Sequence, residues 1–270
     1  MTLPLAELMN RAAMAASDVI LEVYHRQVVA MEKADGSPVT EADQRAEAII
    51  LEYLAETGLP VLAEESVAAG RIPELGARYF VVDPLDGTKE FLKRNGEFTV
   101  NIAYCEDGHP VSGVVLAPAS GEIYWGGPDG AFAGRLAGDA IESVEPLQVA
   151  EAEHPLRIVA SRSHGHAALA ELCDTLEVAQ DVSVGSSLKF CLLAKGDAQL
   201  YPRFTPTSEW DTAAGQAVLQ AAGGVVLGMD GLPLTCGHRD DKFLNAWFVA
   251  AASQKLALRA LAEMLRFVDA

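Results

Sequence analysis

Two aspartates at the end of a predicted strand are the residues whose type and spacing most clearly indicate chemistry. Residues 78–82 are rich in aromatic and β-branched side chains, which predicts a buried strand, and they lead into Asp83-Pro84-Leu85-Asp86-Gly87-Thr88. Hard divalent cations prefer oxygen ligands. Two carboxylates three residues apart across a proline-fixed turn can converge on one cation, and the carbonyl of Leu85 can add another oxygen.

The Gly87-Thr88 step adds an anion-binding element to this run. Its N–H groups, at the start of a short predicted helix, can hold a phosphate through backbone hydrogen bonds and the helix dipole. Taken alone, Asp-Pro and Asp-Gly are ordinary turn formers, and most such turns do no chemistry. Carboxylates at the ends of other predicted elements favour the chemical interpretation: Glu64 and Glu65 after a strand, Asp43 in the first turn of a helix, and Asp211 at the start of another.

Local pattern gives two of these acids a simpler role. Asp211, which precedes Thr212-Ala-Ala-Gly215, is predicted to cap the helix that follows it, with metal binding as an additional role. Asp43, by local pattern alone, would only stabilise the first turn of its helix. Convergence with the other acids would be needed to give either residue a part in catalysis.

The elements that must position these residues are predicted from periodicity and turn signals. Helical spacing predicts an amphipathic helix over residues 5–24 and a second helix that opens at Thr40 and runs through Tyr53. Runs rich in β-formers at hairpin-like intervals predict an antiparallel sheet between residues 97 and 133. Beyond residue 150 strands and helices alternate up to about Phe267, which predicts a layered α/β sandwich in two halves, with the acidic stretch 142–153 as the only linker candidate.

Composition excludes several classes of protein. The chain has 270 residues, half of them apolar, and a formal charge of −18, which would repel a nucleic-acid backbone. Small anionic substrates remain possible if a bound cation and nearby basic residues make the electrostatic potential at the site positive. The sequence has no uncharged apolar run of membrane length, and its four cysteines form neither a C-x-x-C pair nor a zinc pattern with histidines. We therefore expect reduced thiols in a cytoplasmic protein, without secretion or a membrane span.

Three motifs together resemble the inositol monophosphatase superfamily of magnesium-dependent, lithium-sensitive phosphatases. They are Glu64-Glu65, the run from Asp83 to Thr88, and Trp210-Asp-Thr-Ala-Ala-Gly215, whose order and spacing agree over nearly the whole chain. Within that superfamily the chain is similar to the CysQ-type 3′(2′),5′-bisphosphate nucleotidases. The segments that carry this closer similarity are Lys89-Glu90-Phe91, Lys93-Arg94-Asn95-Gly96-Glu97-Phe98-Thr99, Ser161-Arg162-Ser163-His164, Gly185-Ser186-Ser187-Leu188-Lys189-Phe190-Cys191 and Leu200-Tyr201-Pro202-Arg203-Phe204.

The resemblance implies the fold and the metal site. It implies an αβαβα sandwich in one domain over residues 1–270, built of two subdomains, about 1–150 with most metal ligands and about 151–270 with the substrate-side residues. It also implies two or three magnesium ions and inhibition by lithium. The implied ligands are Glu64, Asp83, Asp86, Asp211 and the carbonyl of Leu85. The implied catalytic residues are Asp43 and Thr88, which orient and deprotonate the attacking water, together with Glu64 and the neighbouring Glu65.

The resemblance also implies how a nucleotide is held. Nucleotide contacts fall on Ser161, His164, Gly185 and Lys189, and we add Ser186 and Arg203 from adjacency and charge. Lys189 and Arg203 offer the positive charge that a second phosphate requires, which separates a bisphosphate from an inositol phosphate. The phosphate to be cleaved would contact Leu85, Asp86, Gly87, Thr88 and Asp211.

The expected reaction is magnesium-dependent hydrolysis of 3′-phosphoadenosine 5′-phosphate to AMP and phosphate. A water activated by the metal would attack in line, without a covalent intermediate. The corresponding 5′-phosphosulfate is a further candidate substrate, and the resemblance implies a link to sulfate assimilation.

Other interpretations and partners remain open. The alternatives are an inositol-1-phosphate or fructose-1,6-bisphosphate phosphatase with the same metal site, or a catalytically silent nucleotide sensor. The expected partner is a small nucleotide, with no nucleic acid duplex and no integral membrane contact. The protein would be a monomer or a homodimer, cytoplasmic, with peripheral contact to the inner membrane left open. Residues 134–154 receive no predicted role.

Overall fold

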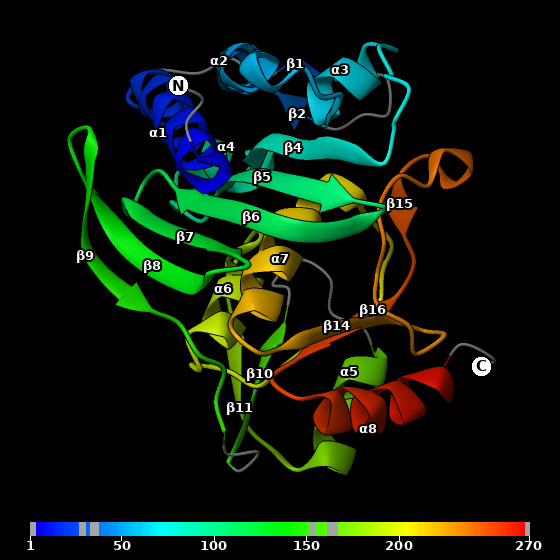
Figure 1. Ribbon diagram of the computed structural model, residues 1–270. Coiled ribbons are helices and arrows are strands. Elements are labelled where there is room, and N and C mark those ends of the chain that lie inside the picture. The colour runs from blue at the N-terminus through cyan, green and yellow to red at the C-terminus, as the bar shows by residue number, and fades with distance from the viewer. Residues whose placement is uncertain (1–3, 27–30, 33–37, 152–154, 161–166, 268–270) are drawn as a thin grey trace.

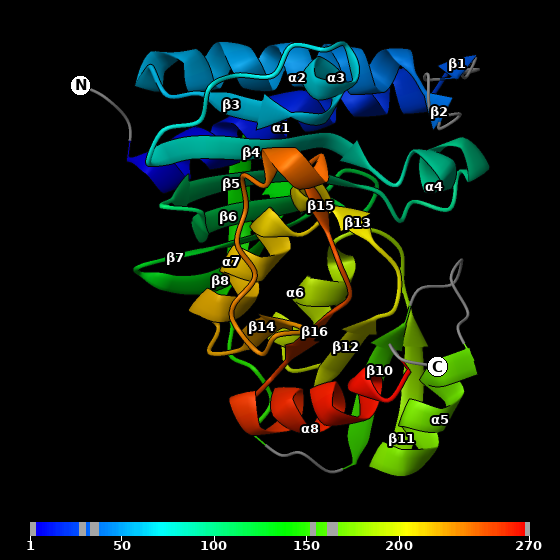
Figure 2. The same cartoon turned by 90° about the vertical axis from the view of Figure 1, so that its right-hand side faces the viewer.

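The structure is a stack of five layers in which helices and sheets alternate (Figure 1). It is a computed structural model that describes residues 4–26, 31–32, 38–151, 155–160 and 167–267. The two long N-terminal helices form the outer layer on one side, and Figure 2 shows the same layers turned by 90°. The predicted αβαβα sandwich is confirmed. Its main helices are α1 (Leu5–Tyr24), α2 (Glu41–Leu54), α5 (Ala167–Leu176), α6 (Leu188–Ala194), α7 (Ala213–Ala221) and α8 (Gln254–Leu265).

The larger sheet has seven strands in sequence order, and each neighbouring pair is antiparallel except β3 and β4. Its strands are β3 (Val61–Ala63), β4 (Arg78–Asp86), β5 (Thr99–Glu106), β6 (His109–Ala117), β7 (Glu122–Gly127), β8 (Gly130–Ala137) and β9 (Ala140–Pro146). The antiparallel sheet predicted between residues 97 and 133 is confirmed. The linker prediction for residues 142–153 is wrong at its start, because residues 142–146 belong to β9, an edge strand whose exposed acids resemble a linker in sequence.

The smaller sheet has five strands in the order β11-β10-β12-β16-β14. They are β10 (Leu156–Ala160), β11 (Val178–Ser183), β12 (Leu200–Arg203), β14 (Val225–Gly228) and β16 (Phe248–Ala251). Two short ribbons complete the strands: β1 (Met31–Glu32) with β2 (Pro38–Val39), and β13 (Thr207–Ser208) with β15 (Leu244–Asn245). The short helices are α3 (Glu64–Ala68), α4 (Thr88–Lys93), and the 3-10 turns η1 (Ala55–Thr57), η2 (Glu209–Asp211) and η3 (Arg239–Asp241).

Three apolar cores separate the layers. One lies between α1, α2 and the larger sheet, and another lies between the smaller sheet, α5 and α8. The middle core contains residues of both sheets and of α6 and α7, which lie between them. Close packing here depends on Gly113 of β6, because a Cβ at this position would lie 2.3 Å from the carbonyl oxygen of Ala214 in α7. The turn η2, just before α7, in turn contacts β4 of the larger sheet.

The helices in the part of the chain that the structure describes are too short or too polar for a bilayer span.

Candidate active site

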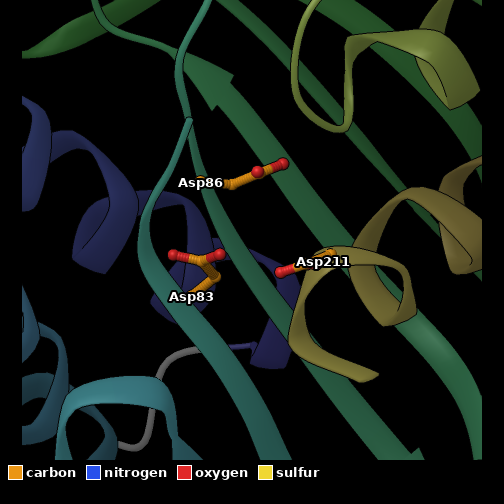
Figure 3. A group of neighbouring side chains, drawn as sticks. All are labelled: Asp83, Asp86 and Asp211. Carbon is orange, nitrogen blue, oxygen red and sulfur yellow. The ribbon is translucent and has the colours of Figure 1, made fainter. Parts of the chain in front are cut away.

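Three aspartates form a cluster where β4 meets η2. One carboxylate oxygen from each of Asp83, Asp86 and Asp211 lies within 4.8 Å of the others (Figure 3). Asp83 and Asp86 are an odd number of residues apart, so a regular strand would place them on opposite faces. The pairing of β4 with β5 shifts register between these two aspartates, since three residue steps on β4 oppose two on β5. This bulge turns both carboxylates to the same side.

The carboxylates of the cluster hold protons more strongly than free carboxylates do. Burial raises the pKa of Asp83 well above its ordinary value, and the neighbouring carboxylates, Glu64 first, raise it further. Burial and the charge of Asp211 raise the pKa of Asp86 to about 7, although Lys189 opposes part of that rise. Burial also raises the pKa of Asp211. The cluster therefore has more negative charge than the surrounding side chains neutralise, and its donors are all oxygens, which suits a hard divalent cation.

Two polar residues that sequence reasoning missed hold Asp86 in place. The hydroxyl of Ser187 lies 3.1 Å from Asp86 Oδ2 and 2.7 Å from the carbonyl oxygen of Asp211. Asn101 Nδ2 donates to Ser187 Oγ at 2.9 Å and lies 3.5 Å from Asp86 Oδ2. A signal was present, because Asn101 lies between Val100 and the run Ile102–Cys105 of β5, and an amide buried among apolar residues requires partners.

Asp211 does not cap the helix that follows it, so that prediction is wrong. The N-cap residue of α7 is Thr212, whose side chain makes no capping hydrogen bond. Asp211 instead ends η2, where its Oδ2 accepts from the Ser208 N–H at 3.2 Å and from the hydroxyl of Thr207. Because Asp211 belongs to η2, its carboxylate lies beside Asp83 and Asp86 of β4 and does not cap α7.

A buried glutamate that the sequence did not single out secures η2. Glu209 is fully buried and accepts from the N–H groups of Gly237 and His238 at 2.6 and 2.9 Å. Its Oε1 also lies 2.8 Å from His238 Nδ1. These contacts tie the loop before η3 to the turn that carries Asp211.

Glu64 and Glu65 begin α3 and differ in their positions. Glu64 lines the same cavity as the aspartates and lies beside Asp83, but it is outside the group of three. The N–H of Glu65 donates to Glu47 Oε2 at 2.7 Å, and the Ser66 hydroxyl donates to Glu47 Oε1 at 2.6 Å. Glu47, on α2, is nearly fully buried and was not predicted from the sequence. It fixes the start of α3 and so the place of Glu64.

Asp43 and Thr88 are in contact although they are far apart in sequence. Asp43 lies in the first turn of α2, as predicted, and its Oδ2 accepts from the N–H and hydroxyl of Thr40 at 2.8 and 2.6 Å. Its Oδ1 accepts from the Thr88 hydroxyl at 3.2 Å. The same hydroxyl lies 3.4 Å from the carbonyl oxygen of Leu85.

A second cavity, of about 200 Å³, adjoins the cluster on the side of the smaller sheet. Gly185, Ser186, Lys189 and Arg203 all line it. Lys189 is 5% exposed, donates to the carbonyl oxygen of Ser186 at 2.8 Å and lies 5.7 Å from the ring of Tyr201. A buried ammonium that faces a cavity is suited to an anionic group.

Ser186 does not direct its hydroxyl into this cavity as a free group. Its Oγ lies 2.8 Å from the carbonyl oxygens of both Asp86 and Glu97, and the Gly185 N–H donates to Glu97 Oε2 at 3.0 Å. Arg203 donates through Nε to the carbonyl oxygen of Thr205 at 3.1 Å. The predicted contacts Ser161 and His164 lie outside the described residues.

Comparisons with known proteins agree with this fold and site. The model of the inositol monophosphatase family matches residues 3–269. The 3′(2′),5′-bisphosphate nucleotidase CysQ of Escherichia coli (strain K12) is 46% identical over 237 residues, covering 86% of this chain and 94% of that protein. The protein of the same name from Buchnera aphidicola is 40% identical over 245 residues, covering 89% and 91%.

Solved structures give the same result. CysQ from Bacteroides thetaiotaomicron, a bacterial member of the inositol monophosphatase family, superposes with a TM-score of 0.76 and 38% identity, covering 92% of this chain and 97% of its own. An inositol monophosphatase from Anabaena superposes with a TM-score of 0.73 at 23% identity, covering 97% and 95%, and shows the fold alone. The chain described here belongs to the inositol monophosphatase family. This is a metal-dependent family, and the aspartate cluster could bind a metal.

Proposed function

We propose that this protein is a 3′(2′),5′-bisphosphate nucleotidase that hydrolyses 3′-phosphoadenosine 5′-phosphate to AMP and inorganic phosphate. The named relatives at 46% and 40% identity support this assignment. The observation that carries it is the adjacency of two cavities: one contains the aspartate cluster, and the other contains Lys189 and Arg203. A substrate with two phosphates can place one in each.

The donor set favours magnesium, and we propose two or three ions. Asp83, Asp86 and Asp211, with Glu64 and the carbonyl of Leu85, would hold them. Bound there, the ions would supply positive charge that acidifies water and neutralises phosphate oxygens. The N–H groups of Gly87 and Thr88 would contact the same phosphate. Lithium is expected to inhibit by competition for one of these positions.

Asp43 and Thr88 would orient the attacking water. Asp43 has both oxygens engaged, one by Thr40 and one by the Thr88 hydroxyl. This arrangement fixes the direction of the Thr88 proton and leaves a lone pair on Oγ1 to accept a proton from water, while Asp43 receives the proton of the hydroxyl. Water would then attack the phosphorus in line, with no covalent enzyme intermediate. Glu65 would support this machinery through its place beside Glu64.

Lys189 and Arg203 would hold the 5′-phosphate, with Gly185 and Ser186 shaping the wall between the two phosphates. The 5′-phosphosulfate analogue would fit the same site, since it keeps the 3′-phosphate. Ser161 and His164 remain proposed nucleotide contacts. We further propose a cytoplasmic enzyme, monomeric or homodimeric, that acts on a free nucleotide and on no nucleic acid duplex.

Phosphate release from three substrates tests the proposal. With magnesium present, 3′-phosphoadenosine 5′-phosphate should be hydrolysed faster than inositol 1-phosphate or fructose 1,6-bisphosphate. Asp83→Asn should reduce turnover by orders of magnitude. Faster release from inositol phosphate would assign the site to the other branch of the family, and nucleotide binding without turnover in the unmodified protein would assign it to a sensor.

A further inference from the structure

The two cavities share one stretch of wall. Five residues line both of them: Asp86, Gly87, Lys89, Glu90 and Asp211. Asp86 and Asp211 belong to the aspartate cluster, and Gly87 has no side chain. Lys89 and Glu90, on the first turn of α4, are therefore the shared residues whose side chains have no role in the site as described so far.

Both side chains are available for contact with a bound molecule. Within the part of the chain that the structure describes, neither makes a side-chain hydrogen bond, an ion pair or a ring contact. Lys89 is exposed, whereas Glu90 is half-buried in the cavity wall. A half-buried carboxylate with no partner among the described residues, next to a cluster that is already anionic, adds repulsion toward an anionic substrate. A hydrogen-bond donor on the substrate would offset that repulsion.

The chemistry of the substrate limits what this donor can be. This step rests on the proposed function. If one phosphate of a nucleoside 3′,5′-bisphosphate lies at the aspartates and the other at Lys189 and Arg203, the ribose must cross the shared wall. The ribose of that molecule has a single free hydroxyl, the 2′-OH, on the carbon next to the ester that is cleaved. A carboxylate can only accept a hydrogen bond, and this hydroxyl can donate one.

We propose that Glu90 is a specificity residue that accepts a hydrogen bond from the ribose 2′-hydroxyl and so selects ribonucleotides over deoxyribonucleotides. Lys89, which is more exposed than Glu90, adds positive charge that attracts ribonucleotides and deoxyribonucleotides equally. By binding the 2′-hydroxyl, Glu90 holds the ribose beside the aspartates, whatever the base of the nucleotide.

A substrate pair isolates this hydrogen bond. We would measure kcat/KM for adenosine 3′,5′-bisphosphate and for its 2′-deoxy analogue with the unmodified enzyme, Glu90→Ala, Glu90→Gln and the matched control Glu52→Ala, an exposed acid on α2 outside both cavities. The unmodified enzyme should prefer the ribonucleotide roughly tenfold or more, as a hydrogen bond to a charged acceptor allows. Glu90→Ala should lose most of that preference through slower turnover of the ribonucleotide alone. Glu90→Gln, which keeps an acceptor oxygen, should retain part of it.

Each other result has a definite meaning. An unchanged preference in Glu90→Ala, or an equal loss on both substrates, overturns the role of Glu90. Should Glu90→Ala fail to fold in thermal melts, the nearly isosteric Glu90→Gln decides, and an unchanged preference there overturns the proposal. No phosphate release from either nucleotide by the unmodified enzyme would instead refute the proposed function, so the two failures are distinguishable.

Discussion

Asp86 lies where protons and the proposed divalent cations would compete for the same oxygens. Its neighbours Ser187 and Asn101 stabilise the charged form, yet burial and Asp211 outweigh them and raise its pKa to about 7. The same competition extends to Asp83 and Asp211, whose pKa values are raised as well. Rising pH should therefore weaken the folding of the metal-free protein and strengthen metal binding, because both depend on the release of the same protons.

The metal-free protein should lose stability as pH rises from about 4 to about 7. An unfolded aspartate releases its proton near its ordinary pKa of roughly 4, whereas folded Asp86 keeps its proton up to about pH 7. The stability that this proton contributes is complete below the unfolded pKa and is lost as pH passes the folded pKa. Thermal melts in a chelator at pH 5, 6, 7 and 8 should show the loss, and Asp86→Asn should reduce it.

Magnesium should raise the melting temperature more at pH 8 than at pH 5, because at low pH the cation must displace protons. The same buffers, with and without the metal, supply the measurement. A magnesium-induced rise that is equal at both pH values would contradict the proposed competition.

Thr88→Val should reduce kcat by roughly 10²- to 10⁴-fold, because it removes the hydroxyl that donates to Asp43 and that we propose orients the attacking water. Thr88→Ser keeps the hydroxyl and should retain most activity. The magnesium-induced rise in melting temperature should persist in both variants, since Thr88 contributes no metal ligand. A loss of that rise in Thr88→Val would mean that the residue acts through the metal site and not on the water.

For individual residues, the sequence predicted the acids of the site but not the buried polar residues that hold them in place. Asp83 and Asp86 stand out because they end an apolar strand. Glu47, Ser187 and Glu209 do not, because their importance comes from partners 18 or more residues away in sequence. Such contacts exist only once the layers are packed.

At the level of elements, the turn between β4 and α4 brings the proposed metal ligands close to the N–H groups that we propose bind phosphate. Gly87 has a φ of +95°, and a Cβ there would lie 2.3 Å from Ser186 Oγ and 3.1 Å from the carbonyl oxygen of Glu97. A left-handed turn without a side chain is therefore required where the loop before α6 crosses it.

Gly87→Ala should destabilise the protein by roughly 1–3 kcal/mol and reduce activity, because both the backbone conformation and the contact with Ser186 oppose a side chain. Gly58→Ala is the matched control, since its φ is +66° with nothing within 4 Å of the added Cβ. Chemical denaturation of both variants gives the comparison. Equal effects would mean that the backbone conformation alone matters and that the approach of Ser186 does not.

The elements themselves were predicted where their pattern was periodic. Helices α1 and α2 have a regular apolar face, and both were predicted with nearly their observed ends. Strands β9 and β11 were missed because both are edge strands in which no side chain is fully buried, so no alternation of buried and exposed residues marks them. Their pairing comes from a neighbouring strand and not from their own sequence.

On the scale of the whole molecule, the middle core joins the two halves of the chain. It contains residues from Leu62 to Ala250, and α7 packs on β6 and β7 of the other half. We therefore propose that residues about 1–150 and about 151–270 are two subdomains of one folding unit. The sequence indicated the division but not the shared core, because helical periodicity does not reveal which sheet a helix will cover.

A chain ending at residue 150 should fail to fold alone, because it would expose the face of the larger sheet that α6 and α7 cover. The complete protein should unfold in one transition when followed by both circular dichroism and tryptophan fluorescence. Two separate transitions in the intact chain, or a cooperative melt of the fragment, would contradict a single folding unit.

The three aspartates of the cluster belong to different layers of the fold. Asp83 and Asp86 belong to the larger sheet, whereas Asp211 ends η2, which leads into α7 of the central helical layer. A cation bound by all three would cross-link the sheet and the helical layer, and its affinity would depend on how these two layers are placed relative to each other. Small core substitutions between sheet and helix, well away from the cleft, should therefore loosen the ion before they unfold the protein.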